Sequence, residues 1–425
     1  MSKLIEYFKT IASIPHCSYE TDALREYLIS FARGMGYQVD TDQAGNILAY
    51  KGTPRLCLQA HYDMVCMGKA PEIEIYDDNG WLHALDASLG ADNGIGIAMM
   101  MCLMEEGREV EFLLTADEEV GLVGAGALEL ELSAGYMLNL DSEDEAVVTI
   151  GCAGGADVIA HMDDEMVDGV GGCYEVAVRD LPGGHSGVDI DKDIPSAIKI
   201  LAAYLEDHDI DQISAIVAGE RRNSIPSNAV AIVRSHSVPV GTAQVSIRPL
   251  NEKPKIYAHS RTILDTISIC KHGVCENNDE LGIPHSSANL AMVYVDGDGK
   301  IDIEISLRAM SMEDLEVITA QRTSRLESWG YTVQITDQYP AWRPERNIFV
   351  ELVAKAVESV FGEVDISAIH AGLECGILSQ KFPHIKFASI GPTIRSPHST
   401  RECVDMRSVE RVFEVVKKIV DSHTS

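Results

Sequence analysis

Acidic and histidine residues stand at the ends of apolar, strand-like runs in this 425-residue chain. Four of five such segments directly end or follow an apolar run. The segments are LQAHYDMV with His61 and Asp63, LGADNG with Asp92, LLTADEEVG with Glu118 and Glu119, LNLDSED with Asp141, and SPHST with His398. In sheets of parallel strands, ligands bind beyond the carboxyl ends of the strands. We therefore expect a fold that brings these side chains together at one edge of a sheet.

The first third of the chain alternates predicted helices and strands. Helices are predicted at residues 3–14, 20–35 and 93–106, and strands at 38–50, 55–60, 110–115 and 136–140. This alternation is typical of βαβ units and a mainly parallel sheet. His61, Glu118, Glu119 and Asp141 then lie at or just beyond carboxyl ends of strands.

The pattern changes after GCAGG at residues 151–155 and returns to helix and strand from Pro340. Between them, strands are predicted at 173–181, 229–235 and 300–310 and helices near 195–207 and 312–329, as in an α+β domain. The expected fold class is α/β: a mixed, mainly parallel sheet flanked by helices, interrupted by an α+β lid. The expected boundaries are 1–154 and 340–425 for the catalytic domain and 155–339 for a lid and dimerisation domain.

Composition excludes several classes of partner. The chain is 46% hydrophobic, which suits two cores, and its formal net charge of -32 argues against nucleic acid or an anionic membrane as partner. No apolar run reaches the roughly 20 residues of a membrane span, and the N-terminus lacks a secretory signal, so a cytoplasmic protein is expected. Ten cysteines without zinc-ribbon spacing predict reduced, mostly buried thiols.

The five segments offer the ligands that a pair of divalent cations needs. Such a pair takes about five nitrogen and oxygen ligands, which His61, Asp92, Glu119, Asp141 and His398 supply. The pattern therefore indicates a two-metal hydrolase. Zinc is the first expectation for both ions, with manganese or cobalt as alternatives.

Two further carboxylates have predicted roles beside these ligands. Asp63 lies two residues beyond His61 on the same strand face, where it can orient the imidazole. Glu118 diverges from Glu119 in extended backbone and is the expected general base. Two alternatives stay open: Asp92 as a helix N-cap, and one of the glutamates as a surface charge. GGHSG does not match the GxSxG motif of serine hydrolases.

A wider set of motifs resembles one family. AHYDMV, LGADNGIG, ADEEVG, LNLDSEDE, GCAGG, GGHSG, RNSIP, SLRAM, HAGLECG and SIGPTIRSPHS are similar to those of the aminoacyl-histidine dipeptidases, also called peptidase D or Xaa-His dipeptidase. These belong to the clan of di-zinc exopeptidases. The likeness runs nearly end to end, and GCAGG, HAGLECG and SIGPTI distinguish the family from the clan.

The resemblance implies roles for individual residues. His61, Asp92 and Asp141 would bind one ion and Asp92, Glu119 and His398 the other, with Asp92 as the bridge and its peptide bond often cis. His185 of GGHSG would stabilise the oxyanion, and Asn223 and Arg308 would contact substrate, with Arg308 on the terminal carboxylate. Glu374 is a candidate for the substrate amino group. Structural alternatives are a turn histidine for His185 and an ordinary salt bridge for Arg308.

The expected function is hydrolysis of unblocked dipeptides, such as Xaa-His or β-alanyl-His, by a metal-bound hydroxide. One alternative is an N-acyl-amino-acid deacylase or carboxypeptidase of the same clan, and another is a catalytically silent metal-binding or scaffold protein. A homodimer through the lid is implied by resemblance. The lid is shorter than in similar enzymes, which leaves open whether His185 serves its own subunit or a partner's.

Overall fold

The computed structural model describes residues 2–423, which divide into two compact units. Unit 1 contains the residues up to Gly151, Trp342–Ala368 and the residues from Leu373 onward. Unit 2 contains Cys152–Ala341 and Ile369–Gly372. The stretch 369–372, which the sequence-based division gives to the catalytic domain, thus groups with unit 2. Among the described residues, no helix is both long and apolar enough to cross a membrane.

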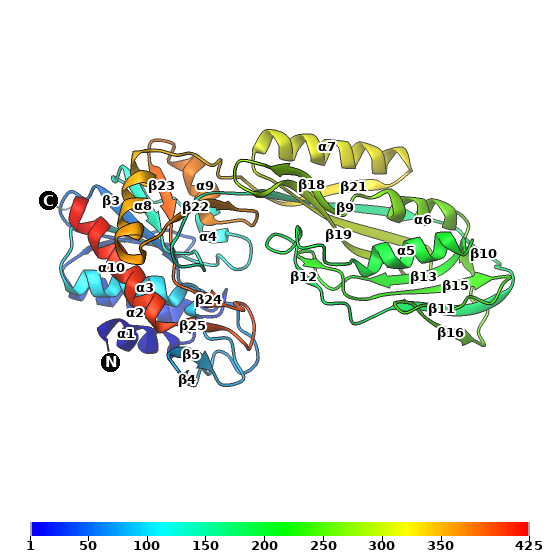
Figure 1. Ribbon diagram of the computed structural model, residues 1–425, viewed down its shortest axis with the longest axis horizontal. Coiled ribbons are helices and arrows are strands. Elements are labelled where there is room, and N and C mark those ends of the chain that lie inside the picture. Colours follow the sequence, from blue (N-terminus) through cyan, green and yellow to red (C-terminus); the bar gives the residue numbers. More distant parts are fainter. Residues whose placement is uncertain (1, 424–425) are drawn as a thin grey trace. The chain divides into compact units, whose positions relative to one another are not determined.

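Unit 1 is built on an eight-stranded mixed sheet (Figure 1). In spatial order its strands are β1 (Gln38–Thr41), β2 (Ile47–Tyr50), β6 (Glu111–Thr115), β3 (Leu56–His61), β7 (Tyr136–Asn139), β23 (Lys386–Ser389), β8 (Val147–Cys152) and β22 (Asp365–Ile369). Strands β6, β3, β7 and β23 are mutually parallel, whereas β1 pairs antiparallel with β2, β2 with β6, and β8 with β23. The expected mixed, mainly parallel arrangement is therefore present at the centre of the sheet.

Helices flank this sheet and supply most of its core. They are α1 (Lys3–Ala12), α2 (Asp22–Gly34), α3 (Ala91–Glu105), α4 (Val123–Gly126), α8 (Ile348–Phe361), α9 (Glu374–Lys381) and α10 (Met406–His423). Helix α3 is apolar on all sides and buried from Asn93 to Met104. Helix α10 is amphipathic and buries Val409, Val412, Val416 and Ile419, a spacing that places them on one face. Helix α8 begins at Asn347, whose side chain accepts hydrogen bonds from two backbone amides.

The single strand predicted at residues 38–50 is wrong. The structure has a hairpin there, β1 and β2, closed by a turn over residues 42–46. The Asp42 carboxylate accepts hydrogen bonds from the backbone and side-chain nitrogens of Asn46, and Gly45 has a φ of 94°. An Asx-type turn at a glycine explains why the apolar run is interrupted.

A small antiparallel sheet in unit 1 carries the chain around His398. Its strands are β24 (Ile394–Arg395), β25 (Cys403–Asp405), β5 (Trp81–Ala84) and β4 (Ile75–Asp78). His398 lies in the loop between β24 and β25. Pairing of β25 with β5 therefore ties this late segment to the N-terminal part of the unit.

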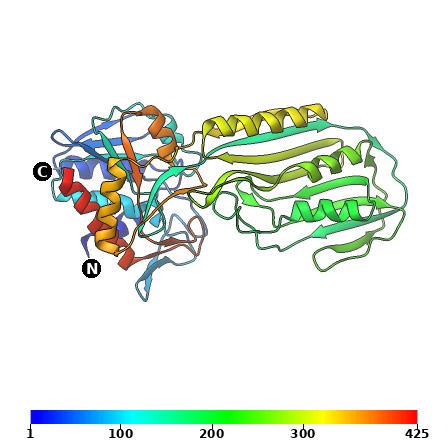
Figure 2. The same ribbon diagram turned by 45° about the horizontal axis from the view of Figure 1, so that its top comes forward.

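Unit 2 contains an antiparallel sheet packed against three helices (Figures 1 and 2). Its strands in order are β16 (Ser246–Leu250), β11 (Gly172–Val178), β15 (Ala229–Ser235), β13 (Gln212–Ala218), β19 (Ile283–Val295), β20 (Lys300–Ala309), β9 (Gly154–Asp163) and β21 (Thr332–Tyr339), with β18 (Gly273–Asn278) also on β19. The helices are α5 (Ala197–Asp207), α6 (Ser260–Ile269) and α7 (Met312–Ser328). Alternate residues of β20, namely Ile301, Ile303, Ile305 and Leu307, join the helices in one core.

Two short ladders complete unit 2. One pairs β10 (Met166–Val167) with β17 (Ile256–Tyr257), and the other pairs β12 (Gly184–His185) with β14 (Ser224–Ile225). The second ladder carries His185 and lies beside Asn223.

Candidate metal centre

All five predicted ligands meet in unit 1. His61 is the last residue of β3, Asp92 lies at the start of α3, and Glu119 and Asp141 follow β6 and β7. His398 comes from the loop between β24 and β25. Strands β6, β3 and β7 are parallel neighbours, so the residues that end them emerge at one edge of the sheet.

The ligand atoms form overlapping groups around Asp92. His61, Asp92 and Asp141 make one group and Asp92, Glu119 and His398 another, with the atoms of each group within 4.8 Å of one another. Oδ1 of Asp92 lies 3.1 Å from Nε2 of His61, and Oδ2 lies 3.2 Å from Nε2 of His398. One carboxylate thus connects two donor sets, which is the arrangement a bridging ligand requires.

The donor chemistry fits a pair of divalent ions. Nε2 of His61 is 3.3 Å from a carboxylate oxygen of Asp141, and Nε2 of His398 is 2.9 Å from one of Glu119. The second carboxylate oxygen of Glu119, Oε1, is buried without a hydrogen-bond partner. Nitrogen and oxygen donors converging in this way match the preferences of zinc and related metals.

Asp92 does not act as a helix N-cap. The N-cap position of α3 is Gly90, no side chain caps the helix, and Asp92 itself has non-helical backbone angles. Its carboxylate instead contacts the two imidazoles. The Asp92–Asn93 peptide is cis, as the family resemblance implies.

The protonation of the metal-free cluster reflects burial and crowding of like charges. Burial and then Asp92 raise the pKa of Glu119 to about 7. Burial also raises the pKa of Asp141 to about 6. Burial alone lowers the pKa of His398, but its hydrogen bonds to Asp92 and Glu119 outweigh this and raise the pKa to about 11. Without a metal, the cluster therefore retains protons at neutral pH.

Glu118 lies beside the ligands with its carboxyl close to His61 and Glu119. Burial, followed by repulsion from Glu119, raises the pKa of Glu118 well above its ordinary value. A buried carboxyl with a raised pKa accepts a proton more readily than an ordinary glutamate, which suits a general base. Glu118 is therefore not an exposed surface charge.

Asp63 contacts His61 and also holds the backbone of the glutamate pair. Nδ1 of His61 is 3.1 Å from the main-chain oxygen of Asp63 but 3.5 Å from its carboxylate. The carboxylate accepts hydrogen bonds from the backbone amides of Glu118 and Glu119 at 2.9 and 3.3 Å, and from the Ser18 hydroxyl at 2.7 Å. Asp63 therefore orients both the imidazole and the glutamate pair.

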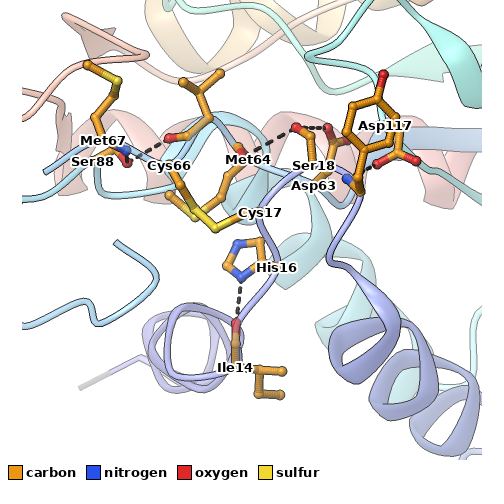
Figure 3. Close-up of a disulfide and its surroundings, with 12 residues drawn as sticks. Ile14, His16, Cys17, Ser18, Asp63, Met64, Cys66, Met67, Ser88 and Asp117 are labelled. Atoms are coloured by element: carbon orange, nitrogen blue, oxygen red, sulfur yellow. Dashed lines mark hydrogen bonds between the residues drawn. A yellow bond between two sulfur atoms is a disulfide. The ribbon is translucent and has the colours of Figure 1, made fainter. Parts of the chain in front are cut away.

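The expectation that all cysteines are reduced is wrong for Cys17 and Cys66, which form a disulfide (Figure 3). The other eight cysteines are not part of this disulfide. Spacing alone could not indicate this pair, because the fold brings together residues 49 positions apart. The bond joins the segment containing Ser18 to the chain that follows Asp63, so it lies next to the hydrogen bond between those two side chains.

Glu374 lies at the start of α9 and is fully buried in unit 1. One oxygen accepts hydrogen bonds from Gln59 and Thr115 at 2.5 and 2.7 Å, while Oε1 has no partner. Burial raises the pKa of Glu374 to about 7. Gln59 and Thr115 were not among the predicted site residues, although each is a polar residue next to apolar ones in a buried strand and could have been singled out on that ground.

His185 and Asn223 come together in unit 2. Nδ1 of His185 accepts hydrogen bonds from the backbone amides of Gly187 and Val188 at 3.2 and 3.3 Å. The neutral ring therefore carries its proton on Nε2, where it can serve as a donor. The main-chain oxygen of Asn223 accepts a hydrogen bond from Ser186, the residue that follows His185.

Arg308 on β20 is buried in unit 2 and is 7% exposed. Nη1 donates to the Tyr339 hydroxyl at 2.6 Å, and Nε has no hydrogen-bond partner. Within residues 2–423 no carboxylate lies within 4.0 Å of this guanidinium, so the salt-bridge alternative is wrong. Sequence reasoning missed Tyr339 as its partner.

Comparison with known proteins identifies relatives across the whole chain. The model of Peptidase family M20/M25/M40 matches residues 57–422. The cytosol non-specific dipeptidase of Escherichia coli (strain K12) is 31% identical and aligns with 98% of this chain and 96% of its own. The crystal structure of aminoacylhistidine dipeptidase from Vibrio alginolyticus superposes with a TM-score of 0.82 at 27% identity, covering 99% of this chain and 96% of that one.

A more distant fold relative is the YXEP protein of Bacillus subtilis, described as a dinuclear metal binding peptidase from the M20 family. Its TM-score is 0.50 at 11% identity, covering 99% of this chain and 97% of that one. This degree of likeness shows a shared fold.

Proposed function

This chain belongs to Peptidase family M20/M25/M40 and is a metallopeptidase, and on that premise we propose that it hydrolyses unblocked dipeptides at a two-metal centre in unit 1. The observation that carries the proposal is the position of Asp92 between His61 and His398. His61, Asp92 and Asp141 would hold one ion, and Asp92, Glu119 and His398 the other. Zinc is the first candidate, with manganese and cobalt as alternatives.

The ions, when bound, supply Lewis-acid polarisation of the scissile carbonyl and lower the pKa of water. Glu118 accepts the proton of the attacking water and passes it to the leaving amine, a role that its raised pKa supports. Asp63 keeps Glu118 in position through the backbone amide. The protein thus provides the proton transfer and the geometry.

Unit 2 and Glu374 provide substrate recognition in this proposal. Nε2 of His185 donates to the oxyanion, and Asn223 contacts the substrate backbone. Arg308 binds the C-terminal carboxylate, which its burial without a carboxylate partner supports. The unpartnered oxygen of Glu374 accepts a hydrogen bond from the substrate's free amino group.

The narrower proposal is a preference for Xaa-His or β-alanyl-His. The Vibrio relative carries that specificity in its name, whereas the E. coli relative is described as non-specific. The latter is also described as cytosolic, which supports a cytoplasmic location here. Unit 2 would act as a lid and would also mediate a homodimer.

A panel assay tests this function. The panel contains β-Ala-His, Gly-His, Leu-Gly, an N-acetylated amino acid and a tripeptide, each with added zinc or manganese. We expect release of amino acids from the free dipeptides and a loss of about 100- to 10,000-fold in kcat for Glu118→Gln at unchanged metal content. The matched control is Glu131→Gln, an exposed glutamate of the same unit.

Other outcomes would contradict specific parts of the proposal. Turnover of the acetylated compound alone would make the enzyme a deacylase. Equal rates on β-Ala-His, Gly-His and Leu-Gly would contradict the histidine preference. Metal-loaded protein that cleaves no compound of the panel would favour a silent scaffold.

A further inference from the structure

Glu402 is a buried carboxylate that binds the backbone of the segment carrying Asp92. It lies four residues after His398 and is 3% exposed. Oε2 accepts hydrogen bonds from the amides of Leu89 and Gly90 at 2.7 and 3.1 Å. Oε1 accepts from Ala91 and Asp92 at 2.8 and 3.4 Å. Four consecutive amides therefore converge on one side chain.

This arrangement offsets an unfavourable burial of charge. Within residues 2–423 no lysine, arginine or histidine forms an ion pair with Glu402, and the metal-free cluster beside it is acidic. A buried carboxylate without a cation needs hydrogen bonds to its charged form. The amides just before α3 and at its start provide them, since such amides have no acceptor within the helix.

The backbone that Glu402 holds is irregular. Gly90 has a φ of 69°, and a Cβ added there would lie 3.0 Å from the sulfur of Met64. Asp92 and Asn93 have non-helical angles although the helix continues after them. Regular helical hydrogen bonding therefore does not fix the orientation of Asp92, whereas the Glu402 carboxylate reaches its amide.

Residues 398–402 contact both the carboxylate and the backbone amide of Asp92. Nε2 of His398 is 3.2 Å from Oδ2 of Asp92, and the amide of Glu402 donates to the main-chain oxygen of Ser399 at 3.1 Å. A tight turn thus joins the histidine that contacts the Asp92 carboxylate to the glutamate that binds the Asp92 backbone.

We propose that Glu402 is a positioning residue that fixes the Asp92 carboxylate relative to His398 and so preorganises the bridge of the metal pair. The inference rests on the proposed two-metal centre. It predicts that changing Glu402 weakens metal binding, beyond any loss of fold stability. Residues that orient ligands commonly change metal affinity by about 10- to 100-fold.

Glu111 provides a matched control. It is also a buried glutamate of unit 1, 2% exposed, and its carboxylate accepts hydrogen bonds from the amides of Ser133 and Ala134. It lies at the opposite end of β6 from the metal centre. Glu111→Gln therefore removes the same kind of interaction without touching the segment of Asp92.

The experiment compares wild type, Glu402→Gln, Glu402→Asp and Glu111→Gln. Mn²⁺ titration followed by electron paramagnetic resonance gives metal affinity and stoichiometry, and thermal unfolding of the metal-free proteins gives stability. In Glu402→Gln an amide NH₂ faces two backbone N–H groups, so we expect Mn²⁺ affinity to fall about 10- to 100-fold. Glu111→Gln should lose stability at wild-type Mn²⁺ affinity.

Wild-type Mn²⁺ affinity in a destabilised Glu402→Gln would overturn the inference, because Glu402 would then only support the fold. Failure of both Glu402 variants to fold, while Glu111→Gln folds, would overturn it too. Wild type that binds two Mn²⁺ ions but cleaves no dipeptide would refute the proposed function and leave this inference intact. Wild type that binds no pair of ions would refute both.

Discussion

Arg308 is the residue whose surroundings most directly suggest a missing partner. Its guanidinium is buried, and within residues 2–423 its one hydrogen-bond partner is the neutral hydroxyl of Tyr339. A substrate carboxylate would provide the acceptor for its remaining donors. We predict that Arg308→Ala raises KM for dipeptides about 10- to 100-fold, the equivalent of one charge-assisted interaction, but changes KM for their C-terminal amides much less.

The control for this prediction is Arg222→Ala, because Arg222 is also in unit 2 but pairs with Glu304 and Asp337. Steady-state kinetics on each acid and amide pair measures the difference. Equal rises in KM for acids and amides would contradict the assignment of Arg308 to the carboxylate.

Tyr339 occupies space that two glycines leave open. A Cβ on Gly155 would lie 2.4 Å from the Tyr339 ring, and one on Gly372 would lie 2.8 Å from it. We predict that Gly155→Ala displaces this ring and destabilises unit 2 by about 1–3 kcal/mol. Because the Tyr339 hydroxyl accepts a hydrogen bond from Arg308, the displacement should also disturb Arg308 and raise KM for dipeptides. Urea unfolding and steady-state kinetics check both effects.

Gly126→Ala is the control, since no other atom lies within 4 Å of a Cβ at Gly126. A stable Gly155→Ala with wild-type KM would show that the ring can move without consequence.

The sequence predicts which site residues come together when these residues lie at the ends of neighbouring strands. It does not predict contacts that depend on packing between segments far apart in the chain. His61, Glu118, Glu119 and Asp141 end or follow strands, so their meeting follows from a parallel sheet. The contacts of Glu402 with residues 89–92 cross 310 or more positions of sequence. No local period or motif spacing encodes such a contact. The same holds for the fit of Tyr339 against Gly155 and Gly372.

At the scale of elements, the disulfide ties the segment after α1 to the segment after β3. Cys17 and Cys66 close a loop of 49 residues, and closing such a loop reduces the entropy of the unfolded chain. We predict that Cys66→Ser lowers the free energy of unfolding by about 2–4 kcal/mol. Urea unfolding under oxidising conditions measures this difference.

Wild type with added dithiothreitol should match Cys66→Ser, because both lack the bond. Cys403→Ser, which removes a free thiol, is the control. Identical unfolding curves with and without reductant would show that the bond adds no stability.

Elements of strong periodicity were predictable, whereas interruptions were not. The helices predicted at residues 3–14 and 93–106 are present as α1 and α3. The hairpin of β1 and β2 was not predicted, because the segments before Asp42 and after Gly45 were joined into one strand. Asp42 and Gly45 are residue types that favour a turn, and this local preference ends the first strand.

At the scale of the whole molecule, the ionisable groups buried at the metal centre should make the stability depend on pH. In the metal-free protein, His398 has a pKa of about 11 and Glu119 a pKa of about 7, both above their ordinary values. A group whose pKa is raised by folding stabilises the protein below its unfolded-state pKa and loses that contribution as the pH rises through the folded value. The metal-free protein should therefore lose stability as the pH increases from 6 to 9.

Bound metal should offset this loss of stability as the pH rises. Divalent ions bind deprotonated imidazole and carboxylate, so binding releases the protons that these groups hold, and metal affinity increases with pH. Tighter binding to the folded state raises its apparent stability by mass action. We predict that the gap between the unfolding temperatures in Mn²⁺ and in EDTA widens from pH 6 to pH 9, measured by thermal unfolding.

His398→Ala separates this mechanism from general charge repulsion in an acidic protein. The variant loses the imidazole that holds the shifted proton and one donor of the second metal group, so the gap should shrink and vary less with pH. Calorimetric titration with Mn²⁺ in two buffers of different ionisation enthalpy counts the released protons, and the variant should release fewer. If wild type and His398→Ala release equal numbers, the proton held by His398 is not displaced by metal, and its contacts with Asp92 and Glu119 serve the fold rather than the centre.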